Sequence, residues 1–169
     1  VLASGGTSPY SYEWNTDPVT TGPAISNVPA GIYQVVVTDA NNCTDILEIE
    51  ITQPDPITIN LLNQVDVGCF GDQTGELEVE AVGGTPPLEY SWNTVPPTAG
   101  TSLSNLGEGS YTVTVTDGNG CQATETYTIT SPDQIEIQVE SIQNVLCNGE
   151  STGTATVSAT GGVPDYTFE

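Results

Sequence analysis

Residues 103–117 read LSNLGEGSYTVTVTD and predict the fold more specifically than any other stretch of the chain. Within them, Leu106, Gly109 and Tyr111 form an L-x-x-G-x-Y pattern that leads into a run of alternating apolar and Thr residues. This pattern is typical of a tyrosine corner, in which a Tyr near the start of the sixth strand of an Ig-like sandwich bonds back to the backbone just upstream. The alternation predicts a strand with one face toward a core. We therefore expect an all-β, Ig-like β-sandwich around this segment.

The same pattern occurs earlier in the chain around Tyr33, and the spacing from Tyr33 to Tyr111 recurs along the rest of the sequence without a gap. We call this spacing the repeat period; a fixed long period indicates a tandem array of one structural module. We expect a partial repeat at 1–53 that holds the C-terminal part of a module, a complete repeat at 55–131, and a partial repeat at 133–169 that holds the N-terminal part. Matching positions include Gly5-Gly6 and Gly83-Gly84, Asp39 and Asp117, Pro54 and Pro132, Cys43 and Cys121, and Cys69 and Cys147.

Comparing the copies separates positions that face the core from positions that face solvent. From Glu76 to Ala81 acidic and apolar residues alternate, and the third copy keeps the apolar positions while its acids become Thr and Ser. Trp92 lies in phase with the apolar face, where an Ig-like sandwich buries its central indole; an exposed Trp that stacks on a sugar is the alternative. The predicted structural core comprises Trp14, Trp92, Tyr33, Tyr111, Val35, Val37, Val113 and Val115.

The chain has no Lys, Arg or His against 22 Asp and Glu, which gives a formal net charge of -22. Nucleic acid is excluded as a partner because phosphate binding relies on Lys and Arg, and an anionic membrane surface is disfavoured for the same reason. No apolar run is long enough to insert into a membrane. The acidity is typical of a chain kept soluble by like charge, and cation binding is the alternative.

The composition also predicts that the chain is not an enzyme. Without His, Lys or Arg the usual pairs of nucleophile and base cannot be built. Paired carboxylates can still cleave glycosides. However, nearly every acid here falls on an outward strand position or a turn, where no apolar pocket raises its pKa. We therefore expect no catalytic residues.

Four cysteines at two fixed phases, Cys43, Cys69, Cys121 and Cys147, predict disulfides. The chain contains no C-x-x-C pair, so a zinc site is disfavoured. Which cysteines pair stays open. An Ig topology places Cys69 and Cys121 at opposite ends of one module. A bridge could instead join the Cys69-type turn to the Cys121-type turn of the next copy, or join Cys43 to Cys69.

Two tight turns carry the candidate metal ligands. Asp39 and Asn41 in one copy, and Asp117 and Asn119 in the next, could bind calcium through side-chain oxygens. They lack the dense D-x-[DN]-x-[DN]-G arrangement of a calcium loop, so a hairpin turn is the favoured interpretation. No other cofactor is expected.

Three spaced motifs connect the chain to a known family: C-x-G-x-x-x-G at 69–75, GGTPPLEYSW at 83–92 and GSYTVTVTDGNGC at 109–121. Together they resemble the SprB repeat, and the last motif is also similar to PKD-type Ig-like modules. SprB repeats occur in many tandem copies in very large surface adhesins of gliding Bacteroidetes. The resemblance implies secretion through the type IX pathway, display on the cell surface, and a part in adhesion and gliding motility. It brings no catalytic residues with it.

Three functions are consistent with a non-catalytic array. The leading hypothesis is a structural stalk of a cell-surface adhesin or filament, whose partners are neighbouring modules of the same long chain. The alternatives are a multivalent polysaccharide-binding array, in which weak sites gain by number, and a self-assembling extracellular fibre in which copies of the chain pack laterally. All three predict an extracellular location, on an outer-membrane-attached or secreted filament.

Overall fold

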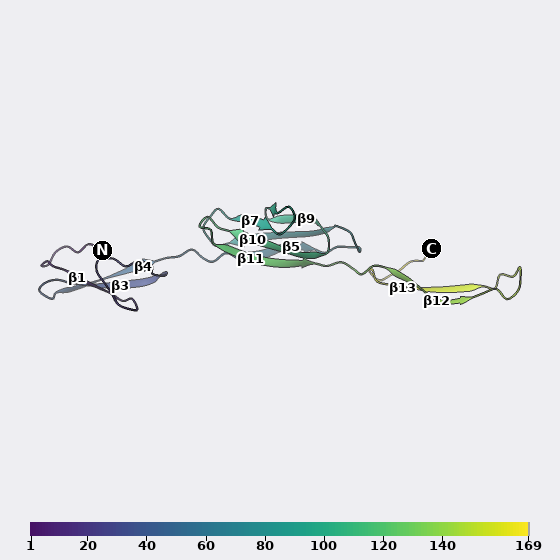
Figure 1. Ribbon diagram of the computed structural model, residues 1–169, viewed down its shortest axis with the longest axis horizontal. Helices are drawn as coiled ribbons and strands as arrows, with labels where there is room; N and C mark the ends of the chain where they lie inside the picture. The colour runs from purple at the N-terminus through teal and green to yellow at the C-terminus, as the bar shows by residue number, and fades with distance from the viewer. Residues whose placement is uncertain (169) are drawn as a thin grey trace. The chain divides into compact units, whose positions relative to one another are not determined.

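The computed structural model describes residues 1–168, and every regular element in that range is a β-strand (Figure 1). The chain separates into two compact units, Val1–Pro54 and Asp55–Glu169. The second unit holds a complete module followed by a β-hairpin. The predicted all-β, tandem Ig-like fold is confirmed. None of residues 1–168 belongs to a helix long and apolar enough to cross a membrane.

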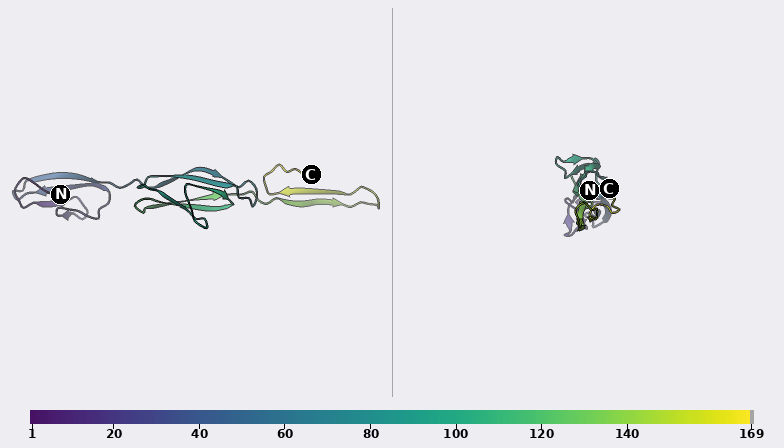
Figure 2. Two further views of the ribbon diagram at one scale, coloured as in Figure 1. Left: turned by 90° about the horizontal axis from the view of Figure 1, so that it is seen from above. Right: turned by 90° about the vertical axis from the view of Figure 1, so that its right-hand side faces the viewer.

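Residues 55–131 form the complete module, a sandwich of two antiparallel sheets (Figure 2). One sheet has the strand order β5-β6-β9 and the other β11-β10-β7-β8. The register of β5 against β6 shifts at a bulge between Leu61 and Asn63. The strands are β5 (Thr58–Val65), β6 (Gly75–Val82), β7 (Glu89–Trp92), β8 (Thr98–Ala99), β9 (Ser102–Leu106), β10 (Gly109–Thr116) and β11 (Gln122–Ile129).

The core of this module lies between the two sheets. Along β6, Leu77 and Val79 are buried, while the alternating residues Glu76, Glu78 and Glu80 are exposed. This pattern arises because successive side chains of a strand point to opposite faces. Burying one Leu or Val side chain stabilises the fold by about 1.5–3 kcal/mol. The buried core residues are Val67, Leu77, Val79, Trp92, Leu103, Leu106, Val113, Val115 and Ile129.

Trp92 is fully buried in this core, and its polar atom is satisfied. Its Nε1 donates a hydrogen bond to the Gly100 carbonyl at 2.9 Å. Its ring lies 6.5 Å from that of Tyr127, with the two planes tilted by 48°. The hydroxyl of half-buried Tyr111 donates to the Gly107 carbonyl at 3.1 Å. The tyrosine corner expected from the sequence is therefore formed.

The polypeptide enters and leaves the complete module at opposite ends. Where β5 begins, the Gly84 N–H donates to the Asp55 carbonyl at 2.8 Å. At the other end, the Val67 N–H donates to the carbonyl of Thr130, just after β11, at 2.9 Å. We call these the N-terminal and C-terminal ends of the module. Both β5 and β11 run from the first end to the second.

A pair of glycines allows the chain to pack closely at the N-terminal end. Gly83 and Gly84 have φ values of +82° and +64°, which are conformations that favour glycine. A Cβ on Gly83 would lie 2.1 Å from the Pro56 carbonyl oxygen. The backbone that enters the module therefore lies directly against the turn that follows β6.

The unit Val1–Pro54 repeats one of the two sheets. Its strand order, β2-β1-β3-β4, matches β8-β7-β10-β11. Trp14 pairs with Val35 as Trp92 pairs with Val113, and both Trp14 and Val35 are buried. Tyr33 forms the same corner, with its hydroxyl 2.7 Å from the Pro29 carbonyl. The strands are β1 (Ser11–Trp14), β2 (Thr20–Thr21), β3 (Gly31–Thr38) and β4 (Thr44–Ile51).

The hairpin at the end of the second unit repeats β5 and β6. It consists of β12 (Glu136–Gln143) and β13 (Thr154–Thr160), which pair with each other in a sheet of two strands. Its bulge, between Val139 and Ser141, lies one repeat period after the bulge in β5.

Candidate functional site

The Asp117 side chain holds the turn between β10 and β11 in place. Its Oδ1 accepts the N–H groups of Asn119 at 2.9 Å and Cys121 at 2.8 Å, while its Oδ2 accepts the Thr85 N–H at 2.9 Å. The Asn119 Nδ2 donates to the Thr85 Oγ1 at 2.9 Å. Asp117 is itself buried. The carboxylate thus joins its own turn to the loop that follows β6, at the N-terminal end of the module.

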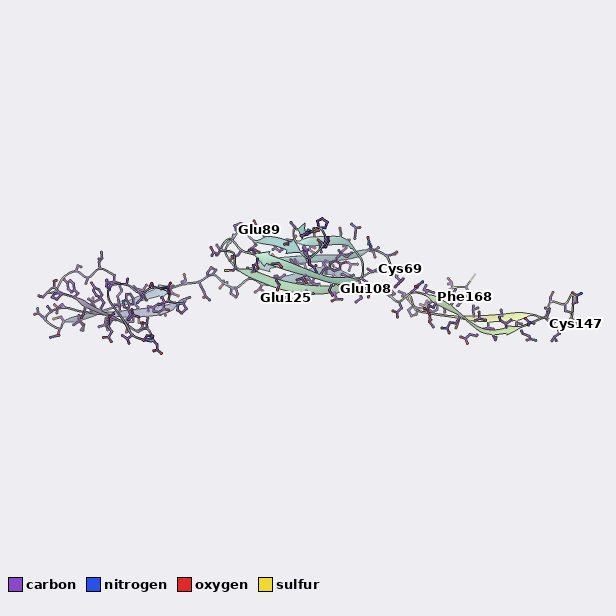
Figure 3. The ribbon with its side chains drawn as sticks, in the orientation of Figure 1. Cys69, Glu89, Glu108, Glu125, Cys147 and Phe168 are labelled. Atoms are coloured by element: carbon purple, nitrogen blue, oxygen red, sulfur yellow. The ribbon has the colours of Figure 1, made fainter. Side chains whose placement is uncertain are left out.

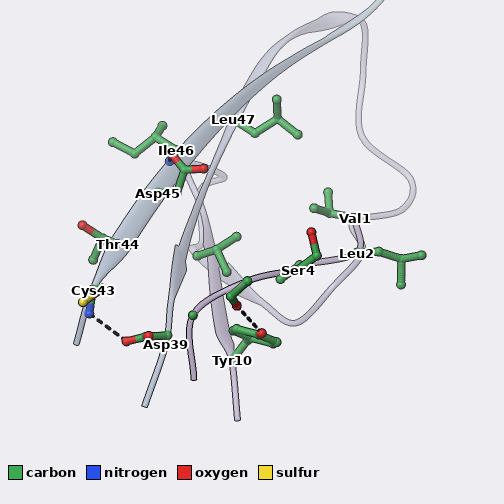
Figure 4. A pocket seen from close by; sticks show the side chains of 14 residues that line it. Val1, Leu2, Ser4, Tyr10, Asp39, Cys43, Thr44, Asp45, Ile46 and Leu47 are labelled. Atoms are coloured by element: carbon green, nitrogen blue, oxygen red, sulfur yellow. Dashed lines mark hydrogen bonds between the residues drawn. The ribbon is translucent and has the colours of Figure 1, made fainter. Parts of the chain in front are cut away.

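The first copy contains the same arrangement around Asp39. Its Oδ1 accepts the N–H group of Asn41 at 2.8 Å and that of Cys43 at 2.9 Å, and its Oδ2 accepts the Thr7 N–H at 2.9 Å. Figure 4 shows the bond between Cys43 and Asp39. The Asn41 Nδ2 donates to the Thr7 Oγ1 at 2.9 Å. Two independent turns therefore give the same role to the same residue types.

Backbone N–H groups keep these carboxylates ionised. The Thr85 N–H, followed by those of Cys121 and Asn119, lowers the pKa of Asp117 below its ordinary value of 3.8, although burial opposes this. The Thr7 N–H lowers the pKa of Asp39 in the same way. Hydrogen bonds to the charged form of an acid favour that form. In a chain without cationic side chains, backbone dipoles stabilise these charges.

The calcium prediction falls on the same two turns. In residues 1–168, no group of three or more His, Cys, Asp or Glu side chains comes together in a way that could hold a metal ion. The oxygens of Asp39 and Asp117 are engaged by backbone N–H groups, and the amides of Asn41 and Asn119 are used on Thr hydroxyls. The geometry is that of a hydrogen-bonded turn, and calcium binding stays a prediction.

Asp66 is a second anchoring residue, which the sequence interpretation missed. Its Oδ1 accepts the Thr130 N–H at 3.0 Å and so joins the end of β5 to the end of β11. The Thr130 N–H is also the main cause of a lowered Asp66 pKa. The third copy has Asn144 at the equivalent position. Asp and Asn both carry a side-chain oxygen that can accept this bond. The recurrence of such an acceptor in the two copies is the signal from which the sequence could have predicted the anchor.

The cysteines require a correction. Cys43, Cys69, Cys121 and Cys147 are all free and exposed, so the prediction of disulfides is wrong for the part of the chain that is described. In the complete module, Cys121 directly precedes β11 and Cys69 follows β5 at the opposite end. An eight-residue strand spans about 27 Å, whereas a disulfide needs Cα atoms within about 7 Å. Cys69 and Cys147 lie in their hairpin turns (Figure 3).

The remaining residues of the predicted core lie on the inner strands. Val113 and Val115 of β10 are fully buried, whereas Val37 of β3 is half-buried. The difference arises because β10 is covered by the sheet β5-β6-β9, and the described part of the first unit contains no equivalent sheet.

Known proteins give two points of similarity. The chain is similar to a solved structure of an amphioxus IgVJ-C2 molecule, with 20% identity, a TM-score of 0.35, and coverage of 76% of this chain and 92% of that chain. No curated protein matches the chain. Residues 61–97 and 139–169 match the SprB repeat family model, and the two matches begin one repeat period apart. The resemblance to the SprB repeat that the sequence predicts is thus confirmed over these residues.

Proposed function

We propose that the chain is a non-catalytic length of stalk in a large, repetitive adhesin or filament. SprB repeats are structural modules of gliding-motility adhesins on the cell surface. The stalk holds an adhesive tip away from the cell envelope during surface adhesion and gliding. An extracellular, outer-membrane-attached or secreted filament, exported through the type IX pathway, belongs to the same proposal.

The observation that carries the proposal is the position of the two ends of the complete module. The chain enters beside Asp55 and leaves beside Thr130, at opposite ends of β11. Each further module therefore adds length to an array. Since β11 spans about 27 Å, a module with its turns adds on the order of 40 Å.

The same arrangement suits a chain that is pulled from both ends. Force applied at the two ends acts along β5 and β11, which run in the same direction. The Val67 N–H bonds the Thr130 carbonyl at 2.9 Å, and the Gln64 Nε2 bonds the Thr128 carbonyl at 2.9 Å. Bonds between strands that are pulled along their length share the load instead of breaking one at a time. This geometry supports a load-bearing role.

The burial of both indoles also favours a stalk over a sugar-binding array. Trp14 and Trp92 are buried, and each donates its N–H to a backbone carbonyl. Neither ring presents a free face on which a sugar could stack.

A deletion series in the full-length adhesin tests the proposal. Whole multiples of the repeat period are removed, and both the filament length and the adhesion per contact are measured. We expect length to fall in equal steps while adhesion per contact holds. A deletion of half a module is the control, since it disrupts the fold without a matching loss of reach.

Two results would contradict the stalk. Adhesion that collapses as copies are removed, although the tip is intact, indicates a multivalent polysaccharide-binding array, because effective concentration is lost. Filament thickness that depends on copy number instead of length indicates a laterally packed fibre.

A further inference from the structure

We propose that the complete module contains a tension clamp, a small set of hydrogen bonds that joins the end of β5 to the end of β11 and sets the force at which the module unfolds. The residues of the tension clamp are Gln64, Asp66, Val67, Thr128 and Thr130. All of them lie within residues 55–131, which have chain on both sides. The inference goes beyond the stalk function, because the reach of an array depends on where each module begins and ends, whereas the clamp determines how much tension one module withstands.

Tension along the chain must cross from one sheet of the complete module to the other. The chain enters through β5, an edge strand of the sheet β5-β6-β9, and leaves through β11, an edge strand of the sheet β11-β10-β7-β8. The core between the sheets consists of apolar contacts, which are non-directional and therefore oppose sliding of one sheet along the other less than directed bonds do. The hydrogen bonds between β5 and β11 are thus the contacts that transmit tension most directly.

Thr130 is held through both of its backbone groups. Its N–H donates to the Asp66 Oδ1 at 3.0 Å, and its carbonyl accepts the Val67 N–H at 2.9 Å. The Asp66 carboxylate supplies the acceptor that a backbone carbonyl of β5 would supply in a regular parallel pair of strands. Thr130 is the first residue after β11, so tension that leaves the module acts directly on it. Thr130 therefore moves outward along the direction of β11 only when both bonds break.

Gln64 adds a second connection two residues earlier on each strand. Its Nε2 donates to the Thr128 carbonyl at 2.9 Å and to the Asp66 Oδ1 at 3.3 Å. Gln64 and Thr128 are 64 residues apart, as are Asp66 and Thr130, so the two connections follow each other in the register of parallel strands. They are loaded together, because β5 is pulled towards the N-terminal end of the module and β11 towards the C-terminal end.

The tension clamp is confined to the C-terminal end of the module. Among the hydrogen bonds of residues 55–131, none joins the first half of β5 to the first half of β11. Glu125, in the middle of β11, pairs with Val113 and so lies on the same face of the sheet. Val113 is buried, whereas Glu125 is exposed, so the sheet β5-β6-β9 leaves the middle of β11 uncovered. A few residues at one end therefore carry the bonds between the two strands.

Resistance to tension and equilibrium stability depend on different bonds. A bond that is broken in the transition state of unfolding contributes to the barrier, whereas a bond that is still intact there contributes to stability alone. Forced unfolding is governed by the unfolding rate and hence by the first kind of bond. The clamp is of this kind, because tension acts on it directly. The bond from Tyr111 to the Gly107 carbonyl is of the second kind, because it involves neither β5 nor β11.

Single-molecule unfolding at constant force tests the tension clamp. The intact chain is held at its two ends, and unfolding of residues 55–131 is recognised as a lengthening of about 200 Å or more, since a stretched residue spans about 3.3–3.6 Å. Asp66→Ala should shorten the lifetime of the module about tenfold at a given force, which is the effect of one hydrogen bond lost from the barrier. Asp66→Asn keeps an acceptor oxygen, as Asn144 does in the next copy, and should recover most of the lifetime.

Tyr111→Phe is the matched control, since it removes one hydroxyl and its 3.1 Å bond within the same module. It should lower the free energy of unfolding in urea and leave the lifetime under force unchanged. Gln64→Ala is a second clamp variant, which loses the bond to the Thr128 carbonyl and should shorten the lifetime about fivefold.

Three results would overturn the proposal. The first is a parent-like lifetime in the Asp66→Ala and Gln64→Ala variants, because the clamp would then carry no load. The second is a lifetime that Tyr111→Phe shortens as much as Asp66→Ala does, because resistance to force would then follow overall stability. The third is an Asp66→Asn module as short-lived as the Asp66→Ala module, because the acceptor oxygen would then not be what holds Thr130.

Discussion

An alanine at Gly83 tests how closely the incoming chain packs against the turn after β6. A Cβ on Gly83 would lie 2.1 Å from the Pro56 carbonyl oxygen, and its φ is +82°. Gly120 has the same φ of +82°, but a Cβ there would meet nothing within 4 Å. The variants Gly83→Ala and Gly120→Ala therefore share the backbone strain and differ only in the close approach.

The free energy of unfolding should separate the two variants. A left-handed conformation costs an alanine about 1–2 kcal/mol, so Gly120→Ala should lose about that much. Gly83→Ala adds overpacking of about 1–3 kcal/mol. It also weakens the 2.8 Å bond from the Gly84 N–H to the Asp55 carbonyl, which is worth about 1 kcal/mol. The expected difference of about 2–4 kcal/mol is a large part of the 5–15 kcal/mol that stabilises a typical domain.

Urea unfolding followed by Trp92 fluorescence measures this difference. Both variants are made in a Trp14→Phe background, so that the single remaining indole reports the complete module. Equal losses in the two variants would refute the reasoning, because they would mean that the Pro56 carbonyl does not restrict Gly83.

Trp92→Ala should destabilise the complete module by about 3–5 kcal/mol, while fluorescence of the remaining Trp14 reports an unchanged Val1–Pro54 unit; a module that melts like the parent would show that the indole is not buried. Stability should fall as the pH drops below about 4, because Asp117 has a pKa below 3.8 in the fold and the unfolded chain takes up the proton first. Because Asn cannot ionise, the Asp117→Asn variant should lose less stability than the parent as the pH falls. A parent chain that is as stable at pH 3 as at neutral pH would contradict this role of Asp117. Calcium at about 1–5 mM should stabilise the chain no more than NaCl of equal ionic strength; a larger effect of calcium would assign a metal site.

The copies within the chain made the fold predictable, since comparing them shows which face of each strand is free to vary. Positions 76, 78 and 80 are Glu in one copy and Thr or Ser in the next, and β6 turns these residues to solvent. Leu77 and Val79 face the core between them. The apolar residues recur at every second position, which is also the period at which a strand turns side chains to one face. The sequence pattern alone therefore predicts which residues of β6 are buried.

The two bulges show where alternation alone fails. A bulge adds one residue to a strand, so the side chains beyond it change faces. The bulge in β5 lies between Leu61 and Asn63, and that in β12 lies between Val139 and Ser141. A strict alternation assigns the wrong face to residues after these points, although in β12 the apolar residues lose phase between Val139 and Ile142 and so mark the inserted residue in the sequence.

The candidate site was predicted in part. The sequence places Asp117 in a tight turn, since Asp, Asn and Gly are typical turn residues. It does not predict the bond to the Thr85 N–H, which joins residues 32 apart in the chain. That bond depends on how the loop after β6 packs on the turn after β10. The disulfide prediction failed although the expected topology correctly placed Cys69 and Cys121 at opposite ends of one module, because spacing along the chain does not show whether a cysteine has a partner within reach.

Asp117 and Asp66 explain how a chain without cationic side chains fixes both ends of a module. Asp117 acts at the N-terminal end and Asp66 at the C-terminal end, and each accepts backbone N–H groups in place of an ion pair. An ion pair on the surface contributes little and weakens with salt, whereas these bonds also satisfy backbone donors of the loops. Within residues 1–168, the acidic residues that do not accept such bonds are exposed to solvent and make the surface negatively charged. One residue type therefore both anchors the two ends of the module and gives the surface its negative charge.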